Sequence, residues 1–178
     1  MIYEESGAIF SDCRTYRFLL WRIWDEVAPK VLFVGLNPSS AGACSDANTV
    51  KRCISFANCA GYGGLYLVNL FAFISTPIAG LLGAHTPEGN PDNDQHIDIA
   101  ARRCKAAIVA WGEEGSHRGR EAVVLSLLLS HFPQLLCLSK KTIGGRTYPQ
   151  HPLPLRSVCT PFHSRNRPYQ SREARRFE

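Results

Sequence analysis

Two asparagines and one histidine follow apolar stretches of the chain, where polar side chains are unexpected. Asn37 lies in "GLNPS" directly after "KVLFV", Asn69 ends "LYLVN", and His151 opens "HPLPL" beyond "QLLCLS". An amide can orient a water molecule or pair with the edge of a nucleobase. A histidine can donate a hydrogen bond to an oxygen on which negative charge develops. The three side chains are candidates for one site, provided that the fold brings them together.

Each of these residues also has an ordinary structural explanation. The Asn37–Pro38 pair can simply turn the chain at the end of a strand. Asn69 can be a buried amide that bonds to loop backbone, since an unpaired one would cost roughly 1–3 kcal/mol. His151 can belong to a proline-rich surface loop. Asp46 is either a carboxylate that folds back over the site or the N-cap of the next helix.

The elements that must position these residues alternate between strands and helices. Four apolar runs predict buried strands: "KVLFVGL", "LYLVNLFAF", "AAIVAWG" and "QLLCLS". Between them, apolar residues at 50, 53, 54 and 57 have helical spacing, and "HIDIAARRCKA" and "GREAVVLSLLLSHF" predict two further helices. "AIFSD" and "YRFLLWRIW" predict an N-terminal edge hairpin. The segment after residue 139 is expected to be irregular.

This alternation predicts a three-layer α/β/α domain whose central sheet has four mainly parallel strands. We expect residues 1–178 to form one domain, with a hairpin extension (1–28), an α/β core (29–156) and a basic C-terminal segment (157–178). Ligands of such sheets bind beyond the carboxyl ends of the strands. Asn37, Asn69, Trp111–Gly112 and His151 all follow a predicted strand, so we expect one shared site there.

Composition narrows the class of protein. Of the 178 residues, 45% are hydrophobic and 20% are charged, values typical of a globular domain. No apolar run reaches the ~20 residues of a membrane span, and the N-terminus does not resemble a signal peptide, so we expect a cytoplasmic protein. We also expect it to be a monomer. The seven cysteines include no C-x-x-C pair, so no metal and no other cofactor is expected.

Positive charge gathers at the C-terminal end of the chain. Residues 140–178 contain nine Lys or Arg and two Glu, a net charge of +7, whereas the whole chain carries +5. Clustered positive charge suits a polyanion such as DNA, although a solvated basic tail is the simpler alternative. The candidates for contacts with phosphate groups are Arg52, Arg156, Arg165 and Arg167.

Four short motifs resemble, in their order, those of the uracil-DNA glycosylase superfamily. They are "VGLNPS" (34–39), "LYLVNLF" (65–71), "IVAWGEE" (108–114) and "HPLPLR" (151–156). The resemblance implies a uracil-DNA glycosylase-like fold and a flipped nucleotide held in a pocket. Asn37 would position the attacking water, and His151 would stabilise the departing base. Asp46 could add a carboxylate if its loop folds back over the site, and Leu153, Leu155 or Arg156 would enter the gap in the duplex. The base would be bound by Gly35, Leu36, Pro38, Asn69 and Phe71.

The chain departs from that superfamily in two places. Residues 39–55 contain no aromatic side chain to stack on the base, for which Phe56, Tyr62 or Phe71 are possible substitutes. The third residue of the His-Pro loop is Leu153 rather than a serine. Most of the chain also resembles the bacterial family called domain of unknown function 1643, in "FSDCRTYRFLLWRIWDE", "LFVGLNPSSA", "RCISFANCAGYGGLYLVNLFAF" and "HPLPL".

Three functions therefore remain open. The first is a hydrolase of the N-glycosidic bond of a damaged, deaminated or modified base in DNA, with a role in DNA repair or modification. The second is a non-catalytic module that binds nucleic acid or a nucleotide in the same pocket. The third is an enzyme of different chemistry that acts on a free nucleoside or nucleobase.

Overall fold

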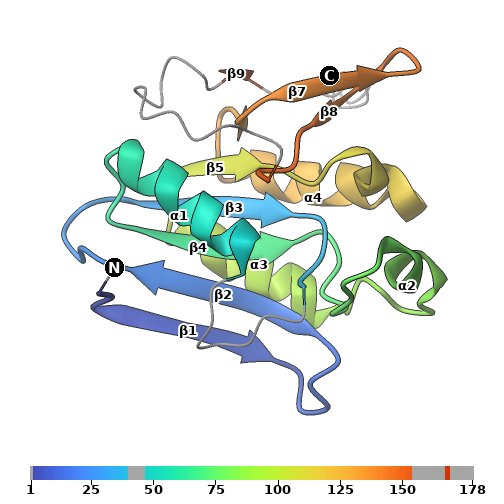
Figure 1. Ribbon diagram of the computed structural model, residues 1–178, viewed down its shortest axis with the longest axis horizontal. Coiled ribbons are helices and arrows are strands. Elements are labelled where there is room, and N and C mark those ends of the chain that lie inside the picture. Colours follow the sequence, from blue (N-terminus) through green and yellow to red (C-terminus); the bar gives the residue numbers. More distant parts are fainter. Residues whose placement is uncertain (1, 40–46, 154–166, 169–178) are drawn as a thin grey trace.

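The protein is built on one large mixed β-sheet (Figure 1). The computed structural model describes residues 2–39, 47–153 and 167–168. In spatial order the seven strands are β1 (Glu5–Phe10), β2 (Arg17–Ile23), β4 (Gly64–Asn69), β3 (Lys30–Gly35), β5 (Ala106–Val109), β6 (Leu136–Cys137) and β9 (Arg167–Pro168). The helices are α1 (Asn48–Cys59), α2 (Ile78–Gly83), α3 (Asp92–Arg102) and α4 (Arg120–Leu129), with a 3₁₀ segment η1 at Glu113–Gly119.

The four strands predicted for the core lie side by side and are parallel. β3 pairs with β4 and with β5, and β5 pairs with β6, all in parallel. The prediction of a mixed α/β fold with a mostly parallel central sheet is therefore confirmed. The predicted number of four strands is wrong, because β2 pairs antiparallel with β4 and the β1–β2 hairpin continues the sheet.

The strand β2 was expected at an edge, and it instead lies inside the sheet. Its residues are almost all buried, including Phe18, Leu19, Leu20 and Ile23. A strand with neighbours on both sides and cover on both faces has no need of alternating polarity. The imperfect alternation of "YRFLLWRIW" is therefore explained by burial, and not by an edge position.

Helices cover both faces of the sheet, so that the domain has three layers (Figure 1). On one face α1 buries Val50, Cys53, Ile54 and Ala57, the four positions that were predicted from their spacing. They pack against Leu65, Leu67 and other residues of the strands. On the other face α3 and α4 pack against a second, larger core around Trp111.

The segment after residue 139 was expected to be irregular, and it begins with a β-hairpin. β7 (Lys140–Ile143) pairs antiparallel with β8 (Arg146–Pro149). The turn is Gly144–Gly145, and both glycines have positive φ angles, 56° and 78°. Two such residues are the signature of a two-residue hairpin turn, because only glycine adopts this geometry freely. The "GG" in "KKTIGGRTYP" was the signal that the sequence reading missed.

Two buried polar side chains from the helical layer hold the carboxyl end of β4. Asn93 is fully buried, and its Nδ2 donates to the carbonyl oxygens of Asn69 and Leu70, at 3.2 Å each. Arg120 Nε donates to the same Leu70 oxygen at 2.7 Å. The backbone carbonyl groups where the chain leaves the sheet are buried. They thus accept hydrogen bonds from protein donors in place of water, as buried carbonyl groups must.

We expect Asn93→Ala to lower the free energy of unfolding by about 1–3 kcal/mol, because two buried carbonyls each lose a donor. Urea unfolding, followed by circular dichroism, measures this loss. Gln95→Ala in the same helix is the matched control, since Gln95 is exposed and its replacement should cost at most ~0.5 kcal/mol. Equal losses in the two variants would contradict a positional role for Asn93.

Within the residues that the structure describes, no helix is long and apolar enough to cross a membrane. In the same ranges, no group of three or more His, Cys, Asp or Glu side chains is arranged to hold a metal ion. Five cysteines are described there and all are free thiols, of which Cys53 and Cys137 are buried and Cys13 and Cys59 are exposed.

Candidate functional site

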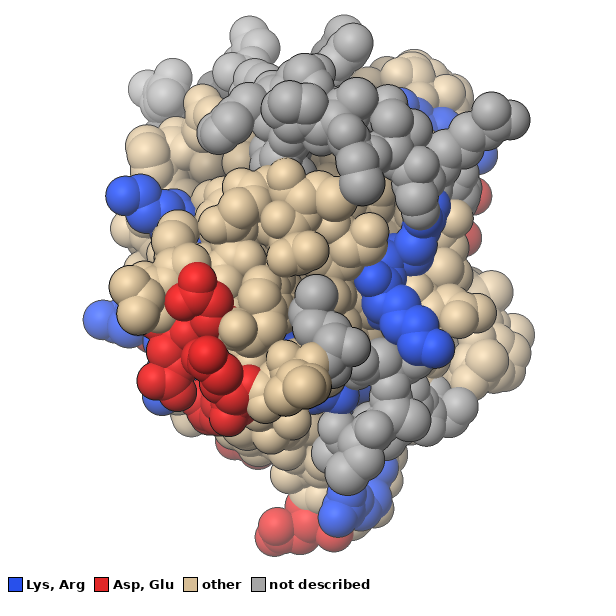
Figure 2. Space-filling model, turned by 60° about the vertical axis from the view of Figure 1, so that its left-hand side comes forward, with Lys and Arg blue, Asp and Glu red and all other residues tan. Residues whose placement is uncertain are grey.

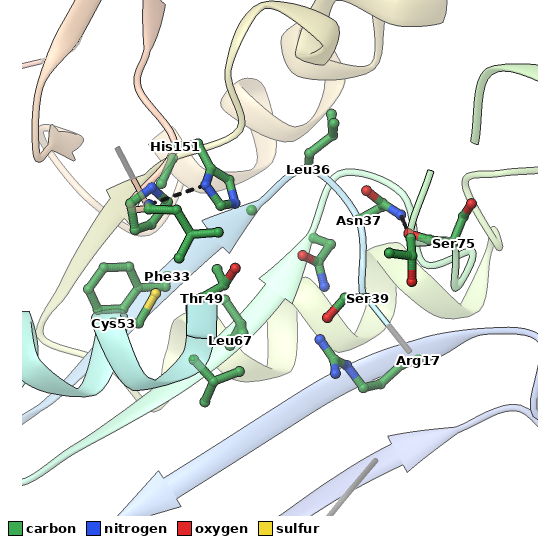
Figure 3. Close-up of a pocket in the computed structure, with 17 residues that line it drawn as sticks. Arg17, Phe33, Leu36, Asn37, Ser39, Thr49, Cys53, Leu67, Ser75 and His151 are labelled. Atoms are coloured by element: carbon green, nitrogen blue, oxygen red, sulfur yellow. Dashed lines mark hydrogen bonds between the residues drawn. The ribbon is translucent and has the colours of Figure 1, made fainter. Parts of the chain in front are cut away.

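A cavity of about 280 Å³ opens at the carboxyl edge of the parallel strands (Figure 3). Asn37, Asn69 and His151 all line it, although they are up to 114 residues apart in the chain. Gly35 and Leu36 also contribute to its wall. The convergence expected from the strand order is therefore observed. Parallel strands end at one edge of a sheet, so residues that follow them meet there.

Asn37 joins two loops at the mouth of the cavity. Its Nδ2 donates to the carbonyl oxygen of Ser75 at 2.8 Å, with longer contacts to those of Pro38 (3.2 Å) and Phe73 (3.4 Å). In Figure 3 the amide group lies beside Ser75. An aspartate here would set a carboxylate against carbonyl oxygens, so the structure explains why this position holds an amide. The bonds also fix the direction of the side-chain oxygen, Oδ1.

Asn69 is the last residue of β4, and its side chain is 3% exposed. Its Nδ2 has no hydrogen-bond partner among the described residues. Gly35 is its neighbour on β3, and a Cβ added there would lie 2.8 Å from Asn69 Oδ1. Glycine at position 35 therefore allows the amide to lie against the backbone of the adjacent strand. A buried donor without a partner is costly, which makes Asn69 a strong candidate for a ligand contact.

His151 lies just beyond β8, on the side of the cavity opposite Asn37 (Figure 3). Its Nδ1 accepts a hydrogen bond from the backbone N–H of Leu153 at 3.3 Å. Burial lowers the pKa of the imidazole below its ordinary value of 6.5. Both effects favour the neutral ring, and since Nδ1 is the acceptor, the hydrogen must be on Nε2. His151 is therefore arranged as a neutral Nε2–H donor.

Arg17 lines the same cavity, and the sequence reading missed it. It is the first residue of β2, which runs antiparallel to β4, so the start of β2 lies at the edge where β4 ends. Its backbone N–H donates to the carbonyl oxygen of Ala72 at 2.9 Å. The site was expected at the carboxyl ends of strands, whereas Arg17 lies at the amino end of one. An arginine at the head of a strand whose only other charged residue is Arg22 was the available signal.

The other lining groups are neutral. Burial raises the pKa of the Cys53 thiol to about 12, so it is uncharged at neutral pH. Among the described residues that line the cavity, none is an aspartate or glutamate. The hydroxyl groups of Ser39, Thr49, Ser75 and Thr76 complete the polar wall.

Three predicted site residues do not line the cavity: two predicted base contacts, Phe71 and Pro38, and one predicted phosphate contact, Arg52. Phe71 is fully buried in the core on the opposite face, with its ring 5.7 Å from that of His117. It does not line the cavity, because β4 ends at Asn69 and the alternation of faces ends with it. Arg52 lies on α1 away from the cavity wall, with its guanidinium 5.8 Å from the Phe56 ring centroid. Pro38 is buried next to the cavity and contributes its carbonyl oxygen to the bonds of Asn37.

Among the described residues, Phe33 of β3 is the phenylalanine, tyrosine or tryptophan that lines the cavity, and neither Phe56 nor Tyr62 does. Phe33 is fully buried in the core below α1. Its ring closes the wall and presents no open face on which a base could stack.

Four other predicted site residues, Asp46, Leu155, Arg156 and Arg165, lie outside the described residues. Arg167 is described only in its backbone, where it pairs with Cys137 at the edge of the sheet. On the face shown in Figure 2, several Asp and Glu side chains gather in one cluster on the left, and Lys and Arg side chains form a line on the right.

A second, smaller cavity of about 180 Å³ adjoins the first, and His151 lines both. Glu113, Glu114 and Lys141 contribute charged side chains to it, and Tyr148 contributes an aromatic ring. The hairpin β7–β8 therefore forms a wall of the second cavity and carries the backbone that leads to His151.

Neither the curated proteins nor the solved structures contain a match. Residues 17–153 match the family described as "Protein of unknown function (DUF1643)". The match covers more than half of the 178 residues, and the chain therefore belongs to the DUF1643 family.

Proposed function

We propose that the protein is a DNA glycosylase-like hydrolase that binds a flipped base in the 280 Å³ cavity and cleaves its N-glycosidic bond. The observation that carries this proposal is the convergence of Asn37, Asn69 and His151 from three separate chain segments on one cavity. The cavity is slightly smaller than the 300–1,000 Å³ typical of small-molecule sites, a size that suits one base. The four motifs that resemble the uracil-DNA glycosylase superfamily add support from the sequence alone.

In this proposal each of the three side chains has a separate task. Asn37 Oδ1, held in direction by the bonds of Nδ2 to Ser75 and its neighbours, accepts a hydrogen bond from the attacking water. The neutral His151 donates from Nε2 to the carbonyl oxygen of the base, where negative charge develops as the bond breaks. Asn69 pairs with the base edge through its amide. An amide is a poor general base, so release depends mainly on stabilisation of the departing base.

The proposed partner is DNA, and the proposed product is an abasic site. Base flipping would use contacts to phosphate groups from Arg52, Arg156, Arg165 and Arg167, with Leu155 inserted into the duplex. The net charge of +7 in residues 140–178 supports a polyanionic partner over a free nucleoside.

A second candidate is a non-catalytic module that binds a flipped base or a nucleotide. Two observations favour it. The amide donor of Asn37 is already bonded to backbone carbonyls, which is a structural task, and no carboxylate occurs among the described residues that line the cavity. Such a protein would bind DNA with a steep dependence on salt and release no base.

The test is a panel of duplex and single-stranded oligonucleotides with uracil, hypoxanthine, xanthine or a bulky modified base, assayed for abasic sites. We expect Asn37→Ala to lower release at least about hundredfold, since the water loses its orienting group, while DNA affinity changes by less than about tenfold. Asn58→Ala, at an exposed position of α1, is the matched control and should keep full activity. Salt-dependent binding without release by the wild type would establish the second candidate instead.

A further inference from the structure

The floor of the cavity combines a positive charge with hydrogen-bond donors. The Arg17 guanidinium lies there, directed toward Ser39 (Figure 3), and Asn69 lines the same cavity. Among the described lining residues Arg17 is the one with a permanent charge, since His151 is neutral and Cys53 is a thiol. The described part of the wall therefore carries a net positive charge.

Arg17 remains charged in this environment. It is 3% exposed, and burial, together with the nearby charge of Arg22, lowers its pKa to about 10. That value is still well above neutral pH, so the guanidinium is protonated under physiological conditions. A guanidinium on a cavity wall can bind the oxygens of an anion that enters the cavity.

Arg22 of the same strand is equally buried and has a different task. Its Nη1 donates to the carbonyl oxygens of Trp21 at 2.8 Å and Gly7 at 3.3 Å, and it lies over the ring of Tyr3. It does not line the cavity. The two arginines thus form a natural pair for comparison, one facing the cavity and one tied to the sheet.

Asn69 provides a second, independent indication of a ligand. Its side chain is 3% exposed, and its Nδ2 has no partner among the described residues. A side-chain amide has two N–H donors and one acceptor. One N–H and the carbonyl oxygen suffice to pair with a base, which leaves the other N–H for a second group of the ligand.

The N-terminal end of α1 faces the cavity as well. Thr49 and Val50 in its first turn line the wall. The N-cap residue is Ala47, whose side chain makes no capping bond, and the first turn contains no acidic residue. The partial positive charge of a helix N-terminus favours anions, and it points in the same direction as Arg17 and Asn69.

We propose that Arg17, the amide of Asn69 and the first turn of α1 form an oxyanion subsite, which takes the phosphate or carboxylate group of the ligand. This inference rests on the proposed function and extends it, because it makes the ligand a nucleotide or another anionic compound and not a neutral base alone. Phosphate and carboxylate share the required chemistry: a negative charge and at least two acceptor oxygens that a guanidinium binds in parallel.

Calorimetric titration of the full chain tests the subsite directly. The ligands are inorganic phosphate, acetate, thymidine and thymidine monophosphate. We expect thymidine monophosphate to bind at least about tenfold more tightly than thymidine, and added salt to weaken its binding. Binding of phosphate but not acetate identifies a phosphoryl ligand, and the opposite result identifies a carboxylate. Equal affinities for thymidine and its monophosphate, with no response to either simple anion, would overturn the proposal.

Two arginine variants separate the subsite from general effects on folding. Arg17→Met keeps the length of the side chain and removes its charge, so anion affinity should fall at least about tenfold. Arg22→Met is the matched control: it should lower stability while affinity for the anion stays within about twofold of the wild type. Arg17→Lys keeps a charge without the planar fork and should bind at an intermediate level. Unchanged affinity in Arg17→Met, or an equal loss in Arg22→Met, would refute the assignment.

The titrations and the base-release assay test the two proposals separately, so that either proposal can be refuted without the other. Anion binding without any release of bases leaves the subsite in place and removes the glycosylase activity. Release of bases by a wild-type protein that binds no small anion leaves the activity and removes the subsite.

Discussion

Replacement of His151 by alanine is expected to lower base release by about 10²–10³-fold, the range for removal of one donor to a developing negative charge. The neutral ring donates from Nε2, because Nδ1 accepts the Leu153 N–H at 3.3 Å. Single-turnover assays of abasic-site formation measure the chemical step. His85→Ala, at an exposed position, is the matched control and should keep wild-type rates.

His151→Gln distinguishes a donor from a residue that only fills space, since an amide can donate to the same oxygen without titrating. We expect it to recover part of the lost rate. If His151→Gln and His151→Ala release bases as fast as the wild type, His151 has no part in the reaction.

The same geometry determines how the stability of the protein depends on pH. The pKa of His151 is lowered by burial, so the neutral donor persists as pH falls to about 6.5, the ordinary histidine value. Further acidification adds a proton to Nδ1 and breaks the bond from Leu153. The unfolded chain takes up this proton at a higher pH than the folded chain does, so stability should decrease as pH falls below about 6.5. The loss of stability at acidic pH should be smaller in His151→Gln than in the wild type. Urea unfolding at several pH values measures this difference.

The second large effect is expected for Arg120→Ala, which should lower the free energy of unfolding by about 3–5 kcal/mol. Arg120 is 3% exposed, donates from Nε to the Leu70 carbonyl at 2.7 Å, and forms an ion pair with Asp94. The variant leaves the Asp94 carboxylate without this partner, and the buried Leu70 carbonyl keeps only the longer bond from Asn93 Nδ2 at 3.2 Å. Urea unfolding measures the loss as a shift of the midpoint.

Arg102→Ala is the matched control for Arg120. Arg102 also pairs with an aspartate, Asp98, at 2.9 Å, but its side chain is 67% exposed. Exposed pairs of this kind contribute little to stability, so the loss should be several times smaller than that of Arg120→Ala. Similar losses in the two variants would show that burial does not set the strength of the Arg120 interactions. Because Arg120 also holds the end of β4, its loss should reduce ligand binding by Asn69 in addition to stability.

Local patterns in the sequence were sufficient for the elements of the core. Continuous apolar runs identified β3, β4, β5 and β6, and the spacing of residues 50, 53, 54 and 57 identified the buried face of α1. These predictions succeed because burial acts on each segment separately: a strand covered on both faces must be apolar throughout, and a helix must be apolar on one side.

The positions of Asn37 and Asn69 also followed from the sequence, because parallel strands place their carboxyl ends at one edge. His151 reaches the same edge through the β7–β8 hairpin, which was not predicted. The hydrogen bonds that these side chains make could not be predicted from the sequence. The bonds of Asn37 to the carbonyls of Phe73 and Ser75 join segments 36 and 38 residues apart, and no local pattern encodes them.

Only the tertiary structure decided that Arg17 belongs to the cavity and that Phe71 does not. Arg17 arrives there because β2 runs antiparallel beside β4, a pairing between segments about 45 residues apart. Phe71 turns to the opposite core because β4 ends two residues before it. Strand order and strand ends depend on which surfaces pack together across the whole chain, and that long-range choice is absent from any short stretch of residues.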